Sequence, residues 1–258
     1  LPNGLRVIVH TDRKAPIVAV NLWYHVGSKD EPSGRSGFAH LFEHLMFNGS
    51  ENYPGEFFTP FKAVGVTDQN GTTNTDRTNY FETVPSNRLE LPLWLESDRM
   101  AFLLDHADEA TFKSQRDVVK NERRQNYENA PYGLVLDFVR RELFPASHPY
   151  HLLTIGTPED LDRAQLEDVR AFFRAWYVPN NAYVVITGRQ SAIRDLFEAI
   201  EGGVDGADGG GTSGAILDFL TDGDAVGLFV EAEDGEEDQL FELTEVFAFG
   251  HSLQNRRY

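Results

Sequence analysis

A glycine-rich, acidic run near position 202 most strongly limits what this sequence can fold into. The run reads EGGVDGADGGGTSG over residues 201–214, and the region 201–258 holds 11 of the 22 glycines. That region carries 14 acidic and 2 basic side chains, whereas residues 1–200 carry 27 and 21. Glycine-rich segments lose the most conformational entropy on ordering and behave as flexible linkers. The sequence therefore predicts one packed domain over residues 1–200, followed by a Gly-rich, acidic linker and tail over residues 201–258.

Two stretches within the tail have a strand-like composition. They are AVGLFVEAE (225–233) and QLFELTEVFAF (239–249), with the acidic sequence DGEED between them. One interpretation is a β-hairpin, because two apolar runs on either side of a turn favour antiparallel pairing. The other is an extended acidic tail, because a high net charge opposes compaction. Both interpretations fit the sequence.

Strands and helices are both predicted in the first 200 residues, and they do not alternate strictly. Runs rich in β-branched and aromatic residues predict strands, and apolar residues at helical spacing predict helices. This order favours an α+β fold, with a mostly antiparallel sheet packed against several helices, over a doubly wound parallel sheet. The predicted strands cover residues 5–10, 17–27, 78–84 and 182–187, and the predicted helices cover 35–50, 88–105, 109–128, 131–144, 158–176 and 191–200.

The composition argues against several classes of protein. A net charge of −18 disfavours a nucleic-acid-binding protein, because binding to phosphates needs clustered Lys and Arg. No apolar run reaches the ~18–20 residues that a membrane-spanning helix needs. The chain has no cysteine, which excludes disulfides and thiolate zinc sites and leaves His and carboxylate as metal ligands. The sequence begins at Leu1 rather than Met, which predicts a removed leader or a fragment.

The most informative motif is His40-Leu41-Phe42-Glu43-His44, in a predicted helix that Ser36 is expected to cap. Residues i, i+3 and i+4 of a helix share one face. Two imidazoles one turn apart can bind one Zn²⁺, and the glutamate between them can accept a proton from a bound water. The order is the inverse of the commoner zinc-protease motif. A helix with two half-buried structural histidines is the alternative.

A zinc site of this kind needs a third protein ligand and one open position for water. Glu122 is the best candidate, because Val118 and Val119 precede it at helical spacing. That pattern predicts a carboxylate on an otherwise buried stripe, which usually marks a pairing or a ligand. The alternative is an ordinary surface glutamate beside Lys120 and Arg123.

The segment HLFEHLMFNGSENYP (40–54) resembles the zinc-binding helix of the pitrilysin/insulinase family of metallopeptidases, the M16 family. The resemblance extends, in the family's order, to QNGTTNTDRTNYFETVP (69–85), RDVVKNERRQ (116–125), HLLTIGTPEDL (151–161) and NNAYVVITG (180–188). It covers nearly all of residues 1–200. It implies a metallohydrolase domain of the M16 type, with one Zn²⁺ per chain.

The resemblance also implies a role for each matching residue at the metal. His40 and His44 would be zinc ligands, Glu122 the third ligand and Glu43 the general base. Many family members carry a second glutamate seven residues before the ligand glutamate. Gln115 occupies that position here, and a neutral amide forms hydrogen bonds without adding negative charge around the metal.

A second implied site concerns the substrate. Asn70, Gly71 and Thr72 match the strand on which the family receives an extended peptide by backbone pairing. The alternative for this segment is a turn rich in Asn, Gly and Thr.

Active members of the family enclose the substrate between two related halves, and the second half supplies an Arg and a Tyr near the reacting carbonyl. Residues 201–258 do not resemble such a half. The resemblance therefore implies a zinc-dependent endopeptidase that acts on peptides or small unfolded proteins and needs a second M16-like half or subunit, in a homodimer or heterodimer. A non-catalytic or assembly subunit, which binds zinc and peptide but does not cleave alone, is the alternative. The resemblance is closest to bacterial forms, which predicts a periplasmic or secreted protein.

Overall fold

The fold is built on one mixed β-sheet. The computed structural model of the protein describes residues 3–66, 68–189 and 229–231. The described strands follow the order β3-β4-β2-β5-β1-β6. Neighbours are antiparallel from β3 to β5, whereas β1 pairs in parallel with both β5 and β6. The strands are β1 (Arg6–Thr11), β2 (Ile17–Tyr24), β3 (Gln69–Thr73), β4 (Thr78–Pro85), β5 (Ala182–Gly188) and β6 (Phe229–Glu231).

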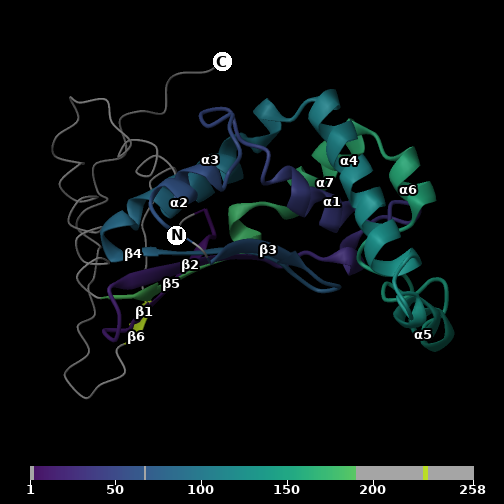
Figure 1. Cartoon of the computed structure of the whole chain (residues 1–258), viewed down its shortest axis with the longest axis horizontal. Helices are drawn as coiled ribbons and strands as arrows, with labels where there is room; N and C mark the ends of the chain where they lie inside the picture. Colours follow the sequence, from purple (N-terminus) through teal and green to yellow (C-terminus); the bar gives the residue numbers. More distant parts are fainter. Residues whose placement is uncertain (1–2, 67, 190–228, 232–258) are drawn as a thin grey trace.

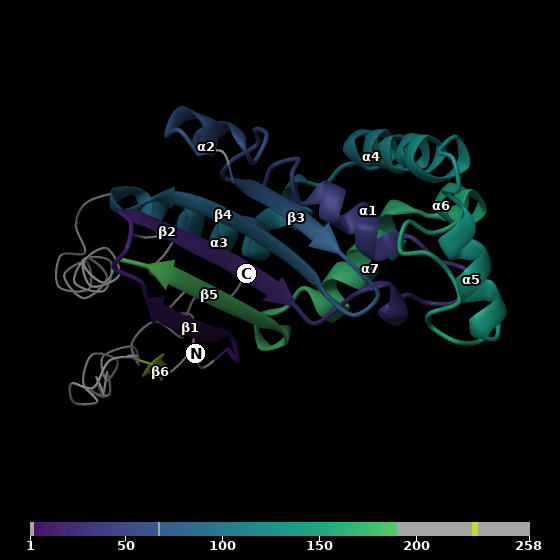
Figure 2. The same cartoon turned by 60° about the horizontal axis from the view of Figure 1, so that its bottom comes forward.

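Helices pack on one face of the sheet and extend beyond one of its ends (Figure 1). The alternation along β2 explains this layering, since Val18 and Leu22 are buried whereas Ile17 and Trp23 are exposed. Figure 2 shows α4, α5 and α6 at the end of the sheet farthest from β6. The helices are α1 (Phe38–Leu45), α2 (Thr59–Ala63), α3 (Glu90–His106), α4 (Glu109–Arg123), α5 (Val135–Leu143), α6 (Pro158–Arg163) and α7 (Leu166–Trp176). In the described part of the chain, no helix combines the length and apolarity needed to cross a membrane.

The predicted α+β fold is confirmed, and the four predicted strands of the first domain correspond to β1, β2, β4 and β5. Two helix predictions need correction. The predicted helix 158–176 is two helices, because the Gln165 N–H donates to Asp168 Oδ2 (3.1 Å) and starts a new helix there. The predicted helix 109–128 ends as α4 at Arg123 and continues as one π-helical turn, Arg124–Glu128. The predicted helix 191–200, the domain boundary near residue 202 and most of the tail lie outside the described residues.

The start of α1 also differs from the prediction. Ser36 does not cap the helix, because its hydroxyl donates to Asp160 Oδ2 (2.6 Å) at the start of α6. The N-cap is Gly37, whose φ of +92° is a left-handed conformation that favours glycine. The helix therefore spans Phe38–Leu45 rather than residues 35–50. Ser36 thus joins the start of α1 to α6 instead of capping α1.

A buried ion pair within α3 lies against the end of α1, where Arg99 Nη1 donates to the Met46 carbonyl (3.4 Å). Arg99 is 1% exposed, and its Nε donates to Glu96 Oε2 (2.7 Å). The guanidinium also lies 3.8 Å from the Phe57 ring centroid and 4.2 Å from that of Tyr80, at the distances of cation–π contacts. Burial raises the pKa of the neighbouring Glu82 well above its ordinary value, so Arg99 is paired chiefly with Glu96.

We predict that Arg99→Met lowers the free energy of unfolding by about 3–5 kcal/mol, because Glu96 would remain buried without its counter-charge. Urea unfolding of the full chain would measure the change. Arg163→Met is the matched control, because the Arg163 side chain is 65% exposed in its ion pair with Asp160 and should cost less than about 1 kcal/mol. Equal losses in the two variants would contradict this account.

Candidate metal centre

Helix α1 places the two histidines of the motif on one side of the molecule. Its eight residues bury an aromatic and aliphatic face, and the Phe42 ring packs on Phe173 and Tyr177 at centroid distances of 5.0 and 4.3 Å. His40 and His44 lie at the margin of that buried face, with ring centroids 4.8 Å apart. Burial of Phe42 therefore fixes the rotation of the helix, and with it the direction of both imidazoles.

The N-terminus of α1 is capped from outside the helix. Both carboxylate oxygens of Glu31 accept hydrogen bonds from α1 amides, from the N–H of Gly37 (3.0 Å) and from that of Ala39 (2.8 Å). These amides have no partners within the helix. Burial raises the pKa of Glu31 to about 8, and the two N–H donors offset this only in part. Glu31 thus performs the capping that Ser36 was expected to perform.

Helix α4 brings Glu122 to the two histidines. The Glu122 Oε2 atom lies 3.3 Å from His44 Nε2 and 3.6 Å from His40 Nε2. The ligand atoms of the three residues all lie within 4.8 Å of one another. The expected buried stripe behind Glu122 needs one correction, since Val119 is buried but Val118 is 42% exposed. The stripe behind Glu122 is therefore only partly buried.

The three side chains fit a zinc ion by distance and by charge. Tetrahedral bonds of ~2.0–2.1 Å place donor atoms roughly 3.3–3.4 Å apart, close to the separations between Glu122 and the two imidazoles. Burial, followed by the neighbouring His44, lowers the pKa of His40 to about 4. The hydrogen bond with His44 lowers the pKa of Glu122. At neutral pH, His40 is therefore neutral and Glu122 ionised, as metal coordination requires.

Glu43 lies beside this cluster and contacts the edge strand of the sheet. The residue is 8% exposed, and its Oε2 accepts a short hydrogen bond from Thr73 Oγ1 on β3. Burial raises the pKa of Glu43, and the Thr73 hydroxyl lowers it in part. A carboxyl group whose pKa is raised toward neutrality can both accept and return a proton. The sequence indicated Glu43 but gave no sign of Thr73 as its partner.

Gln115 lies in the same region but contacts the end of α1 through another side chain. Its Nε2 donates to Asn48 Oδ1 (3.0 Å), and Asn48 Nδ2 donates to the His44 carbonyl (2.7 Å). This chain of hydrogen bonds joins α4 to the last turn of α1. It holds the backbone of His44 relative to the helix that carries Glu122.

The strand β3 lies at one end of the strand order, so one of its edges has no described neighbour. The ladder to β4 is fixed at both ends. The N–H of Thr83 donates to the Asp68 carbonyl (2.9 Å), and the N–H of Asn74 donates to the Arg77 carbonyl (3.0 Å). Asp68 and Asn74, which are both even-numbered, therefore direct their backbone groups toward β4. Because these directions alternate along a strand of an antiparallel pair, the odd-numbered residues of β3 direct N–H and C=O toward the open edge.

This alternation divides the three candidate substrate residues. Gly71 directs its backbone to the open edge, whereas Asn70 and Thr72 direct theirs to β4. Gln69 and Thr73 share the outward direction of Gly71, and the motif gave no reason to select them. The N–H of Gly71 donates to the Asn70 side chain (2.9 Å). The segment is a strand rather than the alternative turn.

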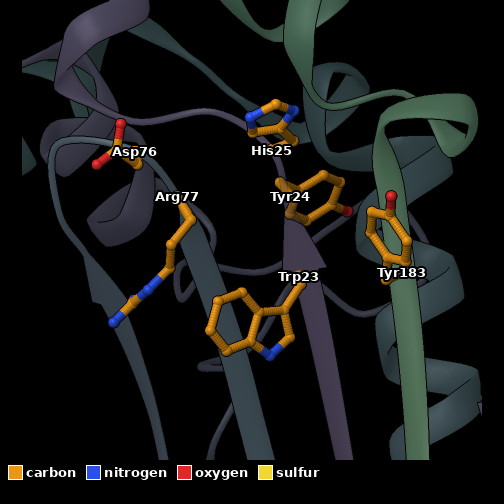
Figure 3. A pocket seen from close by; sticks show the side chains of 6 residues that line it. All are labelled: Trp23, Tyr24, His25, Asp76, Arg77 and Tyr183. Carbon is orange, nitrogen blue, oxygen red and sulfur yellow. The ribbon is translucent and has the colours of Figure 1, made fainter.

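A cavity of about 360 Å³ lies at the end of β2. Figure 3 shows Trp23 and Tyr183 on adjacent strands, with Arg77 extending from the β3–β4 turn. The Arg77 guanidinium lies 5.1 Å from the Trp23 ring centroid and donates to the Thr72 carbonyl (2.9 Å). These contacts stabilise the turn that carries β3. None of the residues that line the cavity belongs to the metal cluster.

The family model of insulinase, peptidase family M16, matches residues 6–153. The protein belongs to the M16 peptidase family. It is 36% identical over 190 residues to the zinc protease PqqE of Helicobacter pylori, covering 73% of this chain and 42% of that protein.

Two solved structures share the M16 fold. A crystal structure of a protease from Helicobacter pylori superposes with a TM-score of 0.70 at 34% identity, covering 75% of this chain and 47% of that one. The periplasmic protease PqqL from Escherichia coli gives a TM-score of 0.67 at 25% identity, covering 76% and 22%. The chain thus spans less than half the length of these M16 relatives.

We predict that Glu122→Gln and His44→Ala each weaken zinc binding by more than 100-fold, because a two-ligand site holds zinc poorly. Gln115→Ala should weaken it by roughly 10–100-fold, because Gln115 acts through the backbone of His44. Competition with a chromophoric chelator would give the affinities. Glu109→Gln, at the exposed start of α4, is the control and should leave the affinity unchanged. A larger effect of Gln115→Ala than of Glu122→Gln would reverse the assigned roles.

Proposed function

We propose that this chain is the zinc-binding half of a zinc-dependent endopeptidase that hydrolyses peptides or small unfolded proteins. The observation that carries the proposal is the convergence of His40, His44 and Glu122, with the carboxylate of Glu43 beside them. The names of the M16 relatives, which are zinc proteases, support it. In this proposal His40, His44 and Glu122 hold one Zn²⁺.

The proposed chemistry divides between the ion and Glu43. A zinc ion held here would supply Lewis acidity toward a water molecule and the scissile carbonyl. The Glu43 carboxylate accepts a proton from the attacking water and then transfers it to the leaving amine. Its burial excludes bulk water, and the Thr73 hydroxyl keeps one oxygen oriented. Glu43 does not coordinate the ion in this scheme.

The open edge of β3 would bind the substrate. An extended peptide that pairs with β3 would use the outward backbone groups of Gln69, Gly71 and Thr73. Packing against Phe47 requires glycine at position 71, because a Cβ there would lie 2.7 Å from that ring. Asn70 would release the Gly71 N–H when a peptide binds. Pairing along β3 places the peptide beside the residue that contacts Glu43.

We propose a second M16-like half or subunit as the partner, since the chain spans 42% of the length of its Helicobacter pylori relative. The part of the relatives beyond the matched unit would complete the substrate enclosure. The Escherichia coli relative is described as a periplasmic protease, which favours a periplasmic or secreted location for this protein.

We predict that Glu43→Gln retains zinc but loses about 10²–10⁴-fold in cleavage of an unstructured peptide, because an amide cannot accept the proton. The zinc-loaded full chain should cleave a quenched fluorescent peptide, weakly if the second half is required. Zinc content measured on the same samples separates loss of metal from loss of the base. Equal cleavage by both proteins would assign the activity to another site or to a contaminant.

We predict that Thr73→Val moves the acidic limb of the kcat/KM–pH profile to higher pH. The Thr73 hydroxyl stabilises the ionised carboxylate and lowers the pKa of Glu43, so its removal raises that pKa. The base must be unprotonated to act, and its active form then appears only at higher pH. Thr73→Ser should restore the profile. An unchanged profile in Thr73→Val, with zinc retained, would exclude this contact from the mechanism.

A further inference from the structure

The residue that follows the candidate ligand Glu122 is a buried arginine. Arg123 is 7% exposed. Its Nη1 donates to the Gly156 carbonyl (2.6 Å), and its Nε donates to Glu128 Oε1 (3.1 Å). Burying a guanidinium costs desolvation free energy that an apolar side chain at this position would avoid. An arginine here therefore indicates a contact of specific geometry rather than a gain in packing.

The Gly156 carbonyl belongs to a segment that packs against the start of α1. Gly156 and Gly37 both have left-handed φ values, +74° and +92°. Their backbones meet so closely that a Cβ on Gly156 would lie 2.5 Å from Gly37 Cα. Gly37 is the N-cap of α1, the helix that carries His40. A side chain at either glycine would force the two backbones apart.

Hydrogen bonds next to this contact hold the two backbones together. The N–H of Thr157 donates to Ser36 Oγ (3.0 Å), and the N–H of Ser36 donates to Asp160 Oδ2 (3.1 Å). Residues 153–157 and the start of α6 are thus tied to the N-terminus of α1. The hydrogen bond from Arg123 to Gly156 links this assembly to the end of α4.

The π-helical turn after α4 keeps the charge of Arg123 paired. On an α-helix, side chains five residues apart differ by about 140° around the axis. A π-helical turn closes its hydrogen bonds five residues apart, here from the Asn129 N–H to the Arg124 carbonyl (2.8 Å). This turn brings Glu128 beside Arg123. Glu128 then balances the charge of the guanidinium, while Nη1 binds the Gly156 carbonyl.

Two links between α1 and α4 therefore lie on either side of the metal cluster. The first runs through Gln115 and Asn48 to the last turn of α1. The second runs through Arg123 and Gly156 to the N-cap of α1. Figures 1 and 2 show α1, α4 and α6 together at one end of the sheet. One link alone would permit rotation of α4 about it, whereas two separate links fix both the distance and the angle between the helices.

We propose that Arg123 is a positioning residue for the metal centre, and that its hydrogen bond to Gly156 sets the place of Glu122 relative to His40. The inference rests on the proposed function, in which these residues hold one Zn²⁺. Arg123 contacts neither the ion nor the substrate in this scheme. Its loss would let the end of α4 shift relative to α1. Zinc binding would weaken, because displaced ligands must be moved back before they can coordinate the ion.

The experiment compares zinc affinity with stability in the full chain. Arg123→Met removes both hydrogen bonds and should raise the Kd for zinc roughly 10–100-fold, as for other residues that orient ligands. Arg170→Met is the matched control, because Arg170 Nη2 also donates to a backbone carbonyl, that of Ala107 (3.0 Å) just before α4. It should leave the Kd unchanged. Competition with a chromophoric chelator gives the Kd, and urea unfolding of the metal-free protein gives the stability.

Two further measurements separate positioning from a general loss of stability. The visible absorption of Co²⁺ bound in place of zinc depends on ligand geometry, so it should change in Arg123→Met and not in Arg170→Met. Gly156→Ala disturbs the same contact from its other side. The effects of Arg123→Met and Gly156→Ala on the Kd should therefore be far from additive in the double variant. Arg123→Lys keeps the charge without the planar fork and should give an intermediate Kd.

The outcomes separate this inference from the proposed function. If the wild-type chain binds zinc and both Arg123→Met and Arg123→Lys leave the Kd unchanged, the positioning role is overturned and the metal site stands. Arg123→Lys alone decides this point if Arg123→Met does not fold, as circular dichroism would show. Fully additive effects in the double variant would also overturn the role, because Arg123 would then act independently of Gly156. A wild-type chain that binds no zinc would remove the metal site and both proposals with it.

Discussion

The metal centre depends on how a helix of only eight residues is held in place. Isolated helices shorter than ~12–15 residues are marginal in water, so α1 cannot fix its own geometry. Its N-terminal amides are bound by Glu31, and its last turn is joined to α4 through Asn48 and Gln115. The Phe42 ring packs on Phe173 in α7 and on Tyr177, which follows α7. The separation between the two histidines and Glu122 is therefore a property of the tertiary structure.

Much of the candidate site could be predicted because it is local in sequence. The spacing of His40, Glu43 and His44 needs only a helix to place them on one face. Glu122 lies far away in sequence, and the apolar pattern behind it was misleading because Val118 is exposed. The assignment of Glu122 as the third ligand therefore depended on the resemblance to the M16 family. Neither the sequence pattern nor the family resemblance gives the distances from Glu122 to the two imidazoles, which only the structure provides.

The predictions that failed concern contacts between distant elements. Ser36 has the residue type and position of an N-cap, but its hydroxyl is taken by Asp160, 124 residues later. Glu31 caps the helix from the preceding loop, and no capping rule identifies such a residue. The apolar residues of α5 have a helical period, and only the structure shows that this side of the helix faces outward. A periodic pattern identifies an amphipathic helix without saying what it packs against.

Two surfaces of the described unit that remain without a described partner are the open edge of β3 and the outward apolar side of α5. The open edge of β3 carries Thr73, which binds Glu43, and α5 is joined to the turn at the end of that strand. Behind α1, by contrast, Arg99 and Glu96 are paired and enclosed by aromatic rings. Backbone groups at a sheet edge and a solvent-facing apolar stripe are both costly to leave uncovered. Of these two surfaces, the open edge of β3 lies beside Glu43, so a partner that pairs with this edge would also lie against the site.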